Sequence, residues 1–165
     1  ITNFYVTPTS RLEFLVGKQL PYIGIGMINF AMLVLIVIFV MQVPLKGSVA
    51  ALVIGALLYV TASTGFGLLV SMVTKSQVAA VFAGAILSML PTMQFSGILQ
   101  PVSTLEGGAR VIGTLWPTTY FMHLSVGAFT KGLGIADLAV NLIVLAGFAP
   151  LFVIISAALL KKQEA

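Results

Sequence analysis

The chain has 165 residues, of which 59% are hydrophobic and 7% charged, and its mean hydropathy is +1.15. A soluble domain of this composition would have too little polar surface to cover its core, so an ordinary water-soluble fold is excluded. The lack of cysteine excludes a disulfide framework and a thiolate metal site in this sequence, and a net charge of +4 without a basic cluster argues against nucleic-acid binding.

Four long stretches of the sequence contain no charged residue: 19–45, 47–74, 76–105 and 138–160. A membrane-spanning helix needs about 20 mostly apolar residues, so each stretch is long enough to cross a bilayer. Within lipid, backbone polar groups must be paired inside the segment, and runs of this length favour helices over the alternating strands of a barrel. The sequence therefore predicts an all-α integral membrane protein.

Residues 1–18 form a predicted cytoplasmic segment ahead of the first span. Ser10 and Glu13 have the spacing of a capping box, which predicts a short helix that begins near Arg11. Pro21 then predicts a bend into the membrane. The sequence opens without an initiator methionine and without a signal peptide, so we expect it to be a fragment of a longer polypeptide.

The four predicted spans cover residues 20–43, 48–73, 77–99 and 138–160. The turn between the first two spans is so short that an antiparallel hairpin is expected. Small residues recur at four-residue spacing in the second and third spans: Ser63, Gly67, Ser71, Ala80, Gly84 and Ser88. Such strips allow close approach of two backbones and predict packing seams, although small residues are also common in membrane helices without any seam.

Residues 100–136 form a predicted external region, because their apolar content is repeatedly interrupted. The uncharged stretch between Arg110 and Lys131 could in principle form a fifth span. Pro117 and His123 make it a poor spanning helix, and a fifth crossing would move the basic C-terminal end to the outer side. We therefore expect a pair of short interfacial or re-entrant helices between the third and fourth spans.

The candidate functional residues within the membrane each have an ordinary structural explanation as well. Asn29 and Gln94 could line a substrate path, but interhelical hydrogen bonds account for such residues more commonly. Pro91 could act as a hinge in the third span, or it could be a static kink. Trp116 is expected at headgroup depth, in the aromatic belt of a membrane interface.

No catalytic constellation can be assembled from the sequence. It contains one histidine and four acidic residues, none of them inside a predicted span, and it has no phosphate-binding loop motif. We expect a segment that is not an enzyme, that holds no cofactor or metal, and that relies on another domain or chain for any nucleotide hydrolysis.

Basic residues are unevenly distributed between the two predicted sides of the membrane. Five lie on the side of the chain ends and three on the other. The first group is Arg11, Lys18, Lys75, Lys161 and Lys162, and the second is Lys46, Arg110 and Lys131. Because an excess of lysine and arginine marks the cytoplasmic side, both ends are predicted to be cytoplasmic.

Three short motifs in this order resemble the ABC-2 type permeases, the membrane subunits of ATP-binding-cassette exporters. A Thr-Pro pair followed by Gly-Lys within residues 7–18 is similar to their cytoplasmic coupling segment. Residues 94–98 resemble the junction before their external re-entrant helices, and residues 116–121 resemble an element within those helices. The resemblance covers essentially the whole chain, and it is strongest to the permease portions of the bacterial ribosome-associated ATPases or to a sister permease subunit.

The resemblance implies a permease that couples ATP hydrolysis elsewhere to transport across a bacterial inner membrane. It assigns the coupling role to Thr7, Pro8, Arg11, Glu13, Gly17 and Lys18. The implied partners are the lipid bilayer, an ATPase domain or subunit that holds ATP and Mg²⁺, and a second permease half. The substrate would be amphiphilic or lipid-like. A complete permease half has more spans than the four predicted here, so the segment would form the C-terminal part of such a domain.

A different class of function is compatible with the same residues. The segment could be a membrane anchor or assembly module that tethers a soluble ATPase, including one that acts at the ribosome, without transporting anything. Strips of small residues would serve either role.

Overall fold

The computed structural model describes residues 11–99 and 101–162, with side chains described within 12–99 and 101–159. Its long helices are α1 (Arg11–Leu35), which continues into the π-helical turn η2 (Ile36–Val40), α2 (Val49–Val73), α3 (Gln77–Phe95) and α6 (Ala139–Lys162). Four helices are long and apolar enough to cross a membrane, and the described residues contain no strand. The predicted all-α membrane fold is confirmed.

Local sequence explains where α2 and α3 begin. The Ser48 hydroxyl accepts a hydrogen bond from the Ala51 N–H at 3.2 Å, and the Ser76 hydroxyl accepts one from the Ala79 N–H at 3.2 Å. Each serine satisfies one of the N–H groups that a helix leaves free in its first turn. The short connection between α2 and α3 therefore ends in a capped helix.

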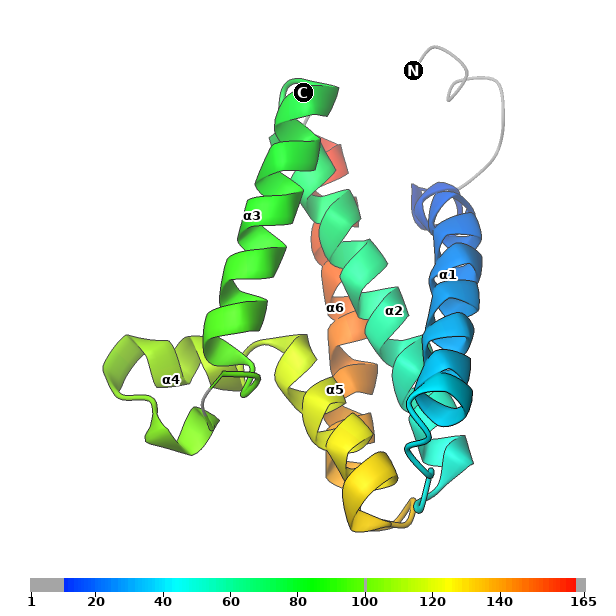
Figure 1. Ribbon diagram of the computed structural model, residues 1–165. Helices are drawn as coiled ribbons and strands as arrows, with labels where there is room; N and C mark the ends of the chain where they lie inside the picture. Colours follow the sequence, from blue (N-terminus) through cyan, green and yellow to red (C-terminus); the bar gives the residue numbers. More distant parts are fainter. Residues whose placement is uncertain (1–10, 100, 163–165) are drawn as a thin grey trace.

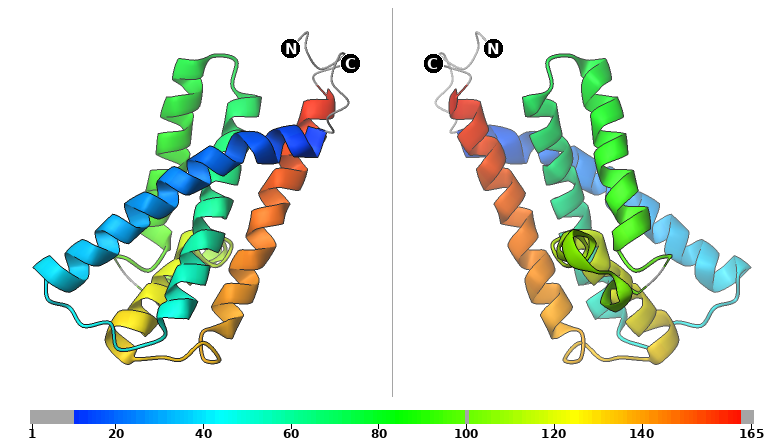
Figure 2. Two further views of the ribbon diagram at one scale, coloured as in Figure 1. Left: turned by 90° about the vertical axis from the view of Figure 1, so that its right-hand side faces the viewer. Right: turned by 90° about the vertical axis from the view of Figure 1, so that its left-hand side faces the viewer.

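The first predicted span differs from the observed helix at both ends. Instead of a short helix followed by a span at 20–43, a single helix runs from Arg11 to Val40, with Pro21 inside it. The N-terminal part of α1 points in a different direction from the rest, as expected where a proline removes a helix hydrogen bond (Figure 2). The helix then ends before residue 43, where Gln42 has a φ of 54°.

The connection between α1 and α2 is longer than the predicted hairpin turn. It covers residues 41–48, and α1 crosses α2 obliquely instead of pairing with it along its length (Figure 2). The third predicted span is also shortened, because α3 ends at Phe95 and not at residue 99. Gly97 has a φ of 92°, a conformation that glycine adopts readily and that cannot continue a helix.

The region between α3 and α6 forms short helices that do not cross the bundle. They are η3 (Val102–Thr104), α4 (Gly107–Thr114), α5 (Pro117–Val126) and the π-helical turn η4 (Gly127–Lys131). In Figure 1, α4 lies beside the lower end of α3, and α5 runs to the end of the bundle that holds the α1–α2 connection. This arrangement agrees with the predicted pair of short helices in place of a fifth span.

Backbone hydrogen bonds join the α1–α2 connection to the end of the short helices. The Gly47 N–H donates to the Ala128 carbonyl at 2.8 Å, and the Ser48 N–H donates to the Leu133 carbonyl at 3.1 Å. Gly132 follows η4 with a φ of 66° and turns the chain toward α6. Two connections distant in the sequence are thus held together at one end of the bundle.

The buried core lies where α2, α5, η4 and α6 meet, and α2 contributes small residues to it. The core cluster is Ala51, Leu52, Leu124, Ala128, Leu138 and Leu145. A Cβ atom at Gly55 would fall on the Leu124 side chain, and one at Gly65 would lie 3.2 Å from the Cβ of Phe152. Close packing therefore uses the face of α2 that carries Ala51, Gly55 and Gly65.

The predicted strips of small residues lie elsewhere. Ser63, Gly67 and Ser71 are exposed on α2, and a Cβ atom at Gly67 or Gly84 would have no atom within 4 Å in the part of the chain that the structure describes. No other part of the described chain packs closely on Gly67 or Gly84, and their role as seams against another helix stays a prediction.

We expect the Gly47→Ala substitution to destabilise the folded protein by about 2 kcal/mol. A Cβ atom there would lie 2.7 Å from the Leu133 carbonyl oxygen and 2.9 Å from the Ala128 Cα, so backbone would have to move and the Gly47–Ala128 hydrogen bond would weaken. The measurement is thermal or denaturant unfolding in detergent. Gly24→Ala is the matched control, because a Cβ atom at Gly24 meets nothing within 4 Å. Equal stability of both variants would contradict the expected contact.

Candidate functional site

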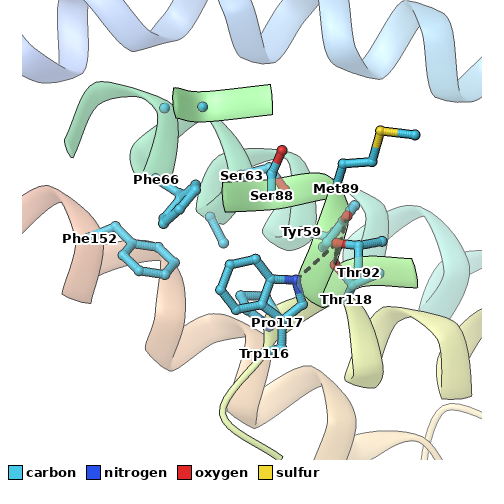
Figure 3. Close-up of a pocket in the computed structure, with 13 residues that line it drawn as sticks. Tyr59, Ser63, Phe66, Ser88, Met89, Thr92, Trp116, Pro117, Thr118 and Phe152 are labelled. Atoms are coloured by element: carbon cyan, nitrogen blue, oxygen red, sulfur yellow. Dashed lines mark hydrogen bonds between the residues drawn. The ribbon is translucent and has the colours of Figure 1, made fainter. Parts of the chain in front are cut away.

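A cavity of about 550 Å³ lies between α2, α3, the start of α5 and α6. Its volume falls within the range of about 300–1,000 Å³ that is usual for small-molecule sites. Figure 3 shows the rings of Phe66, Phe152 and Trp116 on one side of it and the hydroxyl-bearing residues Tyr59, Thr92 and Thr118 on the other. These residues come from four different helices or their ends, so the cavity exists only in the folded chain.

The aromatic side of the cavity is built from edge-to-face contacts. The ring centroids of Phe66 and Trp116 are 5.5 Å apart with an interplanar angle of 76°, and those of Phe66 and Phe152 are 5.7 Å apart at 66°. Such T-shaped pairs are favoured by the quadrupoles of the rings. Trp116 thus packs against other side chains of the protein, and its position at headgroup depth stays a prediction.

The polar side of the cavity is a chain of hydrogen bonds that joins three helices. The Trp116 Nε1–H donates to the Thr92 Oγ1 at 2.9 Å. The Oγ1 atoms of Thr92 and Thr118 are 3.2 Å apart, and the Tyr59 hydroxyl lies 3.0 Å from the Thr118 Oγ1. This network connects α2 and α3 to the start of α5 and fixes the orientation of the indole ring.

The turn between α4 and α5 sets the position of Trp116. Pro117 is the first residue of α5, where its missing N–H costs nothing and its fixed φ favours the helix. The Thr119 hydroxyl donates to the Gly113 carbonyl at 2.7 Å and ties the two helices together. Gly113 itself packs so closely that a Cβ atom there would lie 2.5 Å from the Phe95 carbonyl oxygen. The indole is therefore held between the end of α3 and the start of α5.

The remaining wall of the cavity consists of small residues. Ser63 and Gly67 of α2 and Gly84 and Ser88 of α3 line it, which are members of the two strips predicted as packing seams. Because these side chains are short, they leave space between α2 and α3 where larger residues would fill it. None of the residues that line the cavity, all within the described ranges, has a charged side chain.

A second cavity of about 310 Å³ lies between α1 and α2 and shares Gly67 with the first. Beside it, the Gln19 side chain is 2% exposed and donates to the Thr61 carbonyl at 2.7 Å and to the Thr64 Oγ1 at 2.8 Å. These bonds link α1 to α2 through polar groups. Lys18 also lines this cavity and places a positive charge at its border.

The other sequence-predicted site residues are dispersed. Of the predicted coupling residues, Thr7 and Pro8 lie outside the described residues, Arg11 begins the described part of α1, Glu13 and Gly17 are exposed, and Lys18 borders the second cavity.

The predicted path and hinge residues also lie outside the two cavities. Asn29 and Gln94 are exposed and line neither cavity, and α3 remains helical through Pro91 up to Phe95.

Sequence reasoning missed several residues of the site. Gln19 carried a signal that was available, because an amide directly after Lys18 at the start of a span must find a partner or stay near water. Thr92 lies next to Pro91 and could have been considered with it. Phe66 and Phe152 gave no signal, because an apolar side chain in an uncharged run does not reveal whether it faces lipid or a cavity.

The described residues contain no group of three or more histidine, aspartate or glutamate side chains that could hold a metal ion. The structure does contain two cavities, one with an uncharged lining and one with a single lysine at its border. Cavities of this kind are candidate sites for a small-molecule ligand.

Comparisons with known proteins identify the family. The sequence profile of the ABC-2 family transporter proteins matches residues 2–158. The chain is similar to the probable multidrug ABC transporter permease YbhS of Escherichia coli (strain K12), with 28% identity over 147 residues, which are 89% of this chain and 39% of YbhS. The probable multidrug ABC transporter permease YbhR of the same strain is 27% identical over 131 residues, 79% of this chain and 35% of YbhR. The chain thus spans less than half the length of these relatives, and no solved structure matches it significantly.

Replacing Gln19 by leucine is expected to lower the stability of the folded protein by about 1 kcal/mol, because two interhelical hydrogen bonds are lost and those in membranes contribute about 0.6 kcal/mol each on average. The matched control is Gln94→Leu, which changes the same side chain at an exposed position of α3. Unfolding in mixed detergent micelles measures both. Equal stability of the two variants would show that Gln19 does not hold α1 against α2.

Proposed function

The chain belongs to the ABC-2 family of transporter proteins, and we propose that it forms the last four spans of the permease in an ATP-binding-cassette exporter. The observation that carries the proposal is the family match, which extends over residues 2–158. As a member of a permease family, the chain is a membrane component of the transporter. In the proposal, the hydrolysis of ATP takes place in a separate domain or chain, which also holds ATP and Mg²⁺.

The proposed substrate is an amphiphilic or lipid-like compound. YbhS and YbhR are named probable multidrug transporters, and that name supports a lipophilic substrate for the parent protein of this chain. The aromatic and hydroxyl-lined cavity between α2 and α3 has the size and polarity to hold such a compound.

The proposed coupling route runs through α1. The ATPase would contact the segment around residues 7–18, and a second permease half, identical or different, would complete the transport path. Because α1 and η2 form one helix from Arg11 to Val40, a push at the cytoplasmic end would reach the opposite end of the first span. The location is the bacterial inner membrane.

The alternative function is a membrane anchor for a soluble ATPase. The two functions differ in whether a candidate substrate changes the rate of ATP hydrolysis. The experiment uses the parent protein, together with its ATPase, in liposomes that contain ethidium, the uncharged dye prodan or a fluorescent phosphatidylethanolamine. For an exporter, at least one of these compounds raises the rate of ATP hydrolysis above its basal value, because transport couples the two processes. A rate that none of them changes would favour the anchor.

The proposed orientation places both ends of this segment in the cytoplasm. The start of α1, the α2–α3 connection and the end of α6 lie at one end of the bundle, and the α1–α2 and α5–α6 connections lie at the other (Figure 2). Lys75 lies at the first end, and Lys46 and Lys131 lie at the second. The excess of basic residues at the first end supports its assignment to the cytoplasm.

Single-cysteine labelling tests this orientation, because the segment has no cysteine of its own. In a parent protein without other cysteines, Lys46→Cys and Lys131→Cys are expected to react with a membrane-impermeant maleimide in intact cells whose outer membrane is permeabilised. Lys75→Cys should react only after the inner membrane is opened. Labelling with the opposite pattern would invert the orientation, and opposite accessibility of Lys46→Cys and Lys131→Cys would contradict the fold.

A further inference from the structure

We propose that the cavity between α2 and α3 binds an uncharged, ring-containing lipophile that has a hydrogen-bond-accepting oxygen. The inference rests on the transport function proposed above and specifies a site and a chemical class of substrate for it. Three properties of the cavity carry it: the absence of charge from its lining, the aromatic side formed by Phe66, Trp116 and Phe152, and the hydroxyl network on the opposite side.

The lining decides the charge of the ligand. Its polar groups are hydroxyls and one indole N–H, and no lining residue has a carboxylate, an ammonium or a guanidinium group. Transfer of an ion into such a site costs several kcal/mol when no opposite charge compensates it. Lys18 lies in the neighbouring cavity and does not line this one. An uncharged ligand avoids this cost.

The aromatic side of the cavity indicates the shape of the apolar part of the ligand. Phe66 makes edge-to-face contacts with both Trp116 and Phe152, so the three rings form a continuous surface with faces and edges at angles of 66° to 76°. A flat ring system can contact such a surface through stacked or edge-to-face pairs, which add to the energy of apolar burial. Met89, an adaptable side chain, also lines the cavity and can follow the outline of different rings.

The hydroxyl network decides the polar feature of the ligand. The Trp116 N–H and the hydroxyls of Tyr59, Thr92 and Thr118 together have four hydrogens to donate, but only three hydrogen bonds join them. Whichever direction the bonds take, one hydroxyl hydrogen has no acceptor within the network. All three hydroxyl residues line the cavity, so a carbonyl or ester oxygen of a ligand can accept this hydrogen.

The glycines on the opposite wall keep the cavity open. A Cβ atom at Gly84 would meet no atom within 4 Å, although Gly84 lines the cavity. A side chain at this position therefore begins without a clash at its Cβ atom, and we expect a large one to occupy the ligand space. Gly147 of α6 is equally free of neighbours but does not line the cavity, so it is a matched control position.

The experiment measures binding of prodan to the parent protein in detergent without ATP. Prodan is an uncharged naphthalene with a ketone oxygen, and it accepts excitation energy from tryptophan. In a parent protein without tryptophan outside this sequence, we expect saturable energy transfer that is lost in Trp116→Phe, because Trp116 is the only tryptophan of this sequence. Gly84→Phe is expected to weaken saturable binding by roughly tenfold or more, and Phe152→Leu by roughly threefold to tenfold. Gly147→Phe should bind like the unmodified protein.

The thermal stability of Gly84→Phe is measured in parallel. A stable variant with weakened binding supports the site. Unchanged binding in a stable Gly84→Phe protein overturns the proposal, and so does a clear loss of its stability, because that result would mean that another helix of the transporter fills the cavity. Saturable binding of ethidium that equals that of prodan would also overturn it, since the ligand would then not be selected for lack of charge.

Competition tests the need for a ring. Dioctanoylglycerol is uncharged and has ester oxygens but no ring, so it is not expected to displace prodan. Displacement of prodan by this lipid at a comparable concentration would overturn the ring-containing class of ligand. Because this binding is measured without ATP, it can be present even if no compound stimulates ATP hydrolysis, so failure of the site and failure of the transport function give different results.

Discussion

The packing of α2 against α5 and α6 is the interaction on which the rest of the structure depends. Helices in lipid gain little hydrophobic energy from meeting each other, so close contact between backbones and side chains must hold them together. Small buried residues of α2, among them Ala51, Gly55 and Gly65, permit this contact, and Leu124 of α5 occupies the space that Gly55 leaves. The short helices and α6 are thereby held on one side of α2.

The other face of α2 also carries small residues, but there they line a cavity and do not pack closely against another helix. Ser63 and Gly67 face α3, which stands away from α2, and the space between them becomes a cavity. Since α3 has no buried residue among those described, polar contacts at its end hold it in place. The bonds from Thr92 to Trp116 and Thr118 are such contacts, so the same network stabilises α3 and lines the candidate site.

The short helices contribute both to the core and to the cavity. They fill the end of the bundle where the core lies, and they present Trp116 to the cavity from a turn that Pro117 and the Thr119–Gly113 hydrogen bond define. At their other end, η4 binds the α1–α2 connection through the backbone of Ala128. The α1–α2 connection and the helices that carry one cavity wall are thus joined by backbone hydrogen bonds.

The sequence by itself determined the elements that depend on local chemistry. Uncharged runs predicted four membrane-spanning helices, Ser48 and Ser76 mark helix starts by side-chain capping, and interruptions around Pro117 predicted short helices instead of a fifth span. These features follow from the requirement that every backbone group be paired within its own segment in lipid.

Only the tertiary structure decided which faces of those helices meet. Small residues occur on both faces of α2, and nothing local distinguishes a packed face from a cavity wall. The orientation of the Trp116 indole depends on Thr92, a hydrogen-bond partner that is distant in the sequence. Phe66 and Phe152 become one surface only after α2 and α6 have packed. Such pairs form only when each helix has a particular rotation and crossing angle. Long-range contacts determine both quantities, and they cannot be derived from the composition of a single segment.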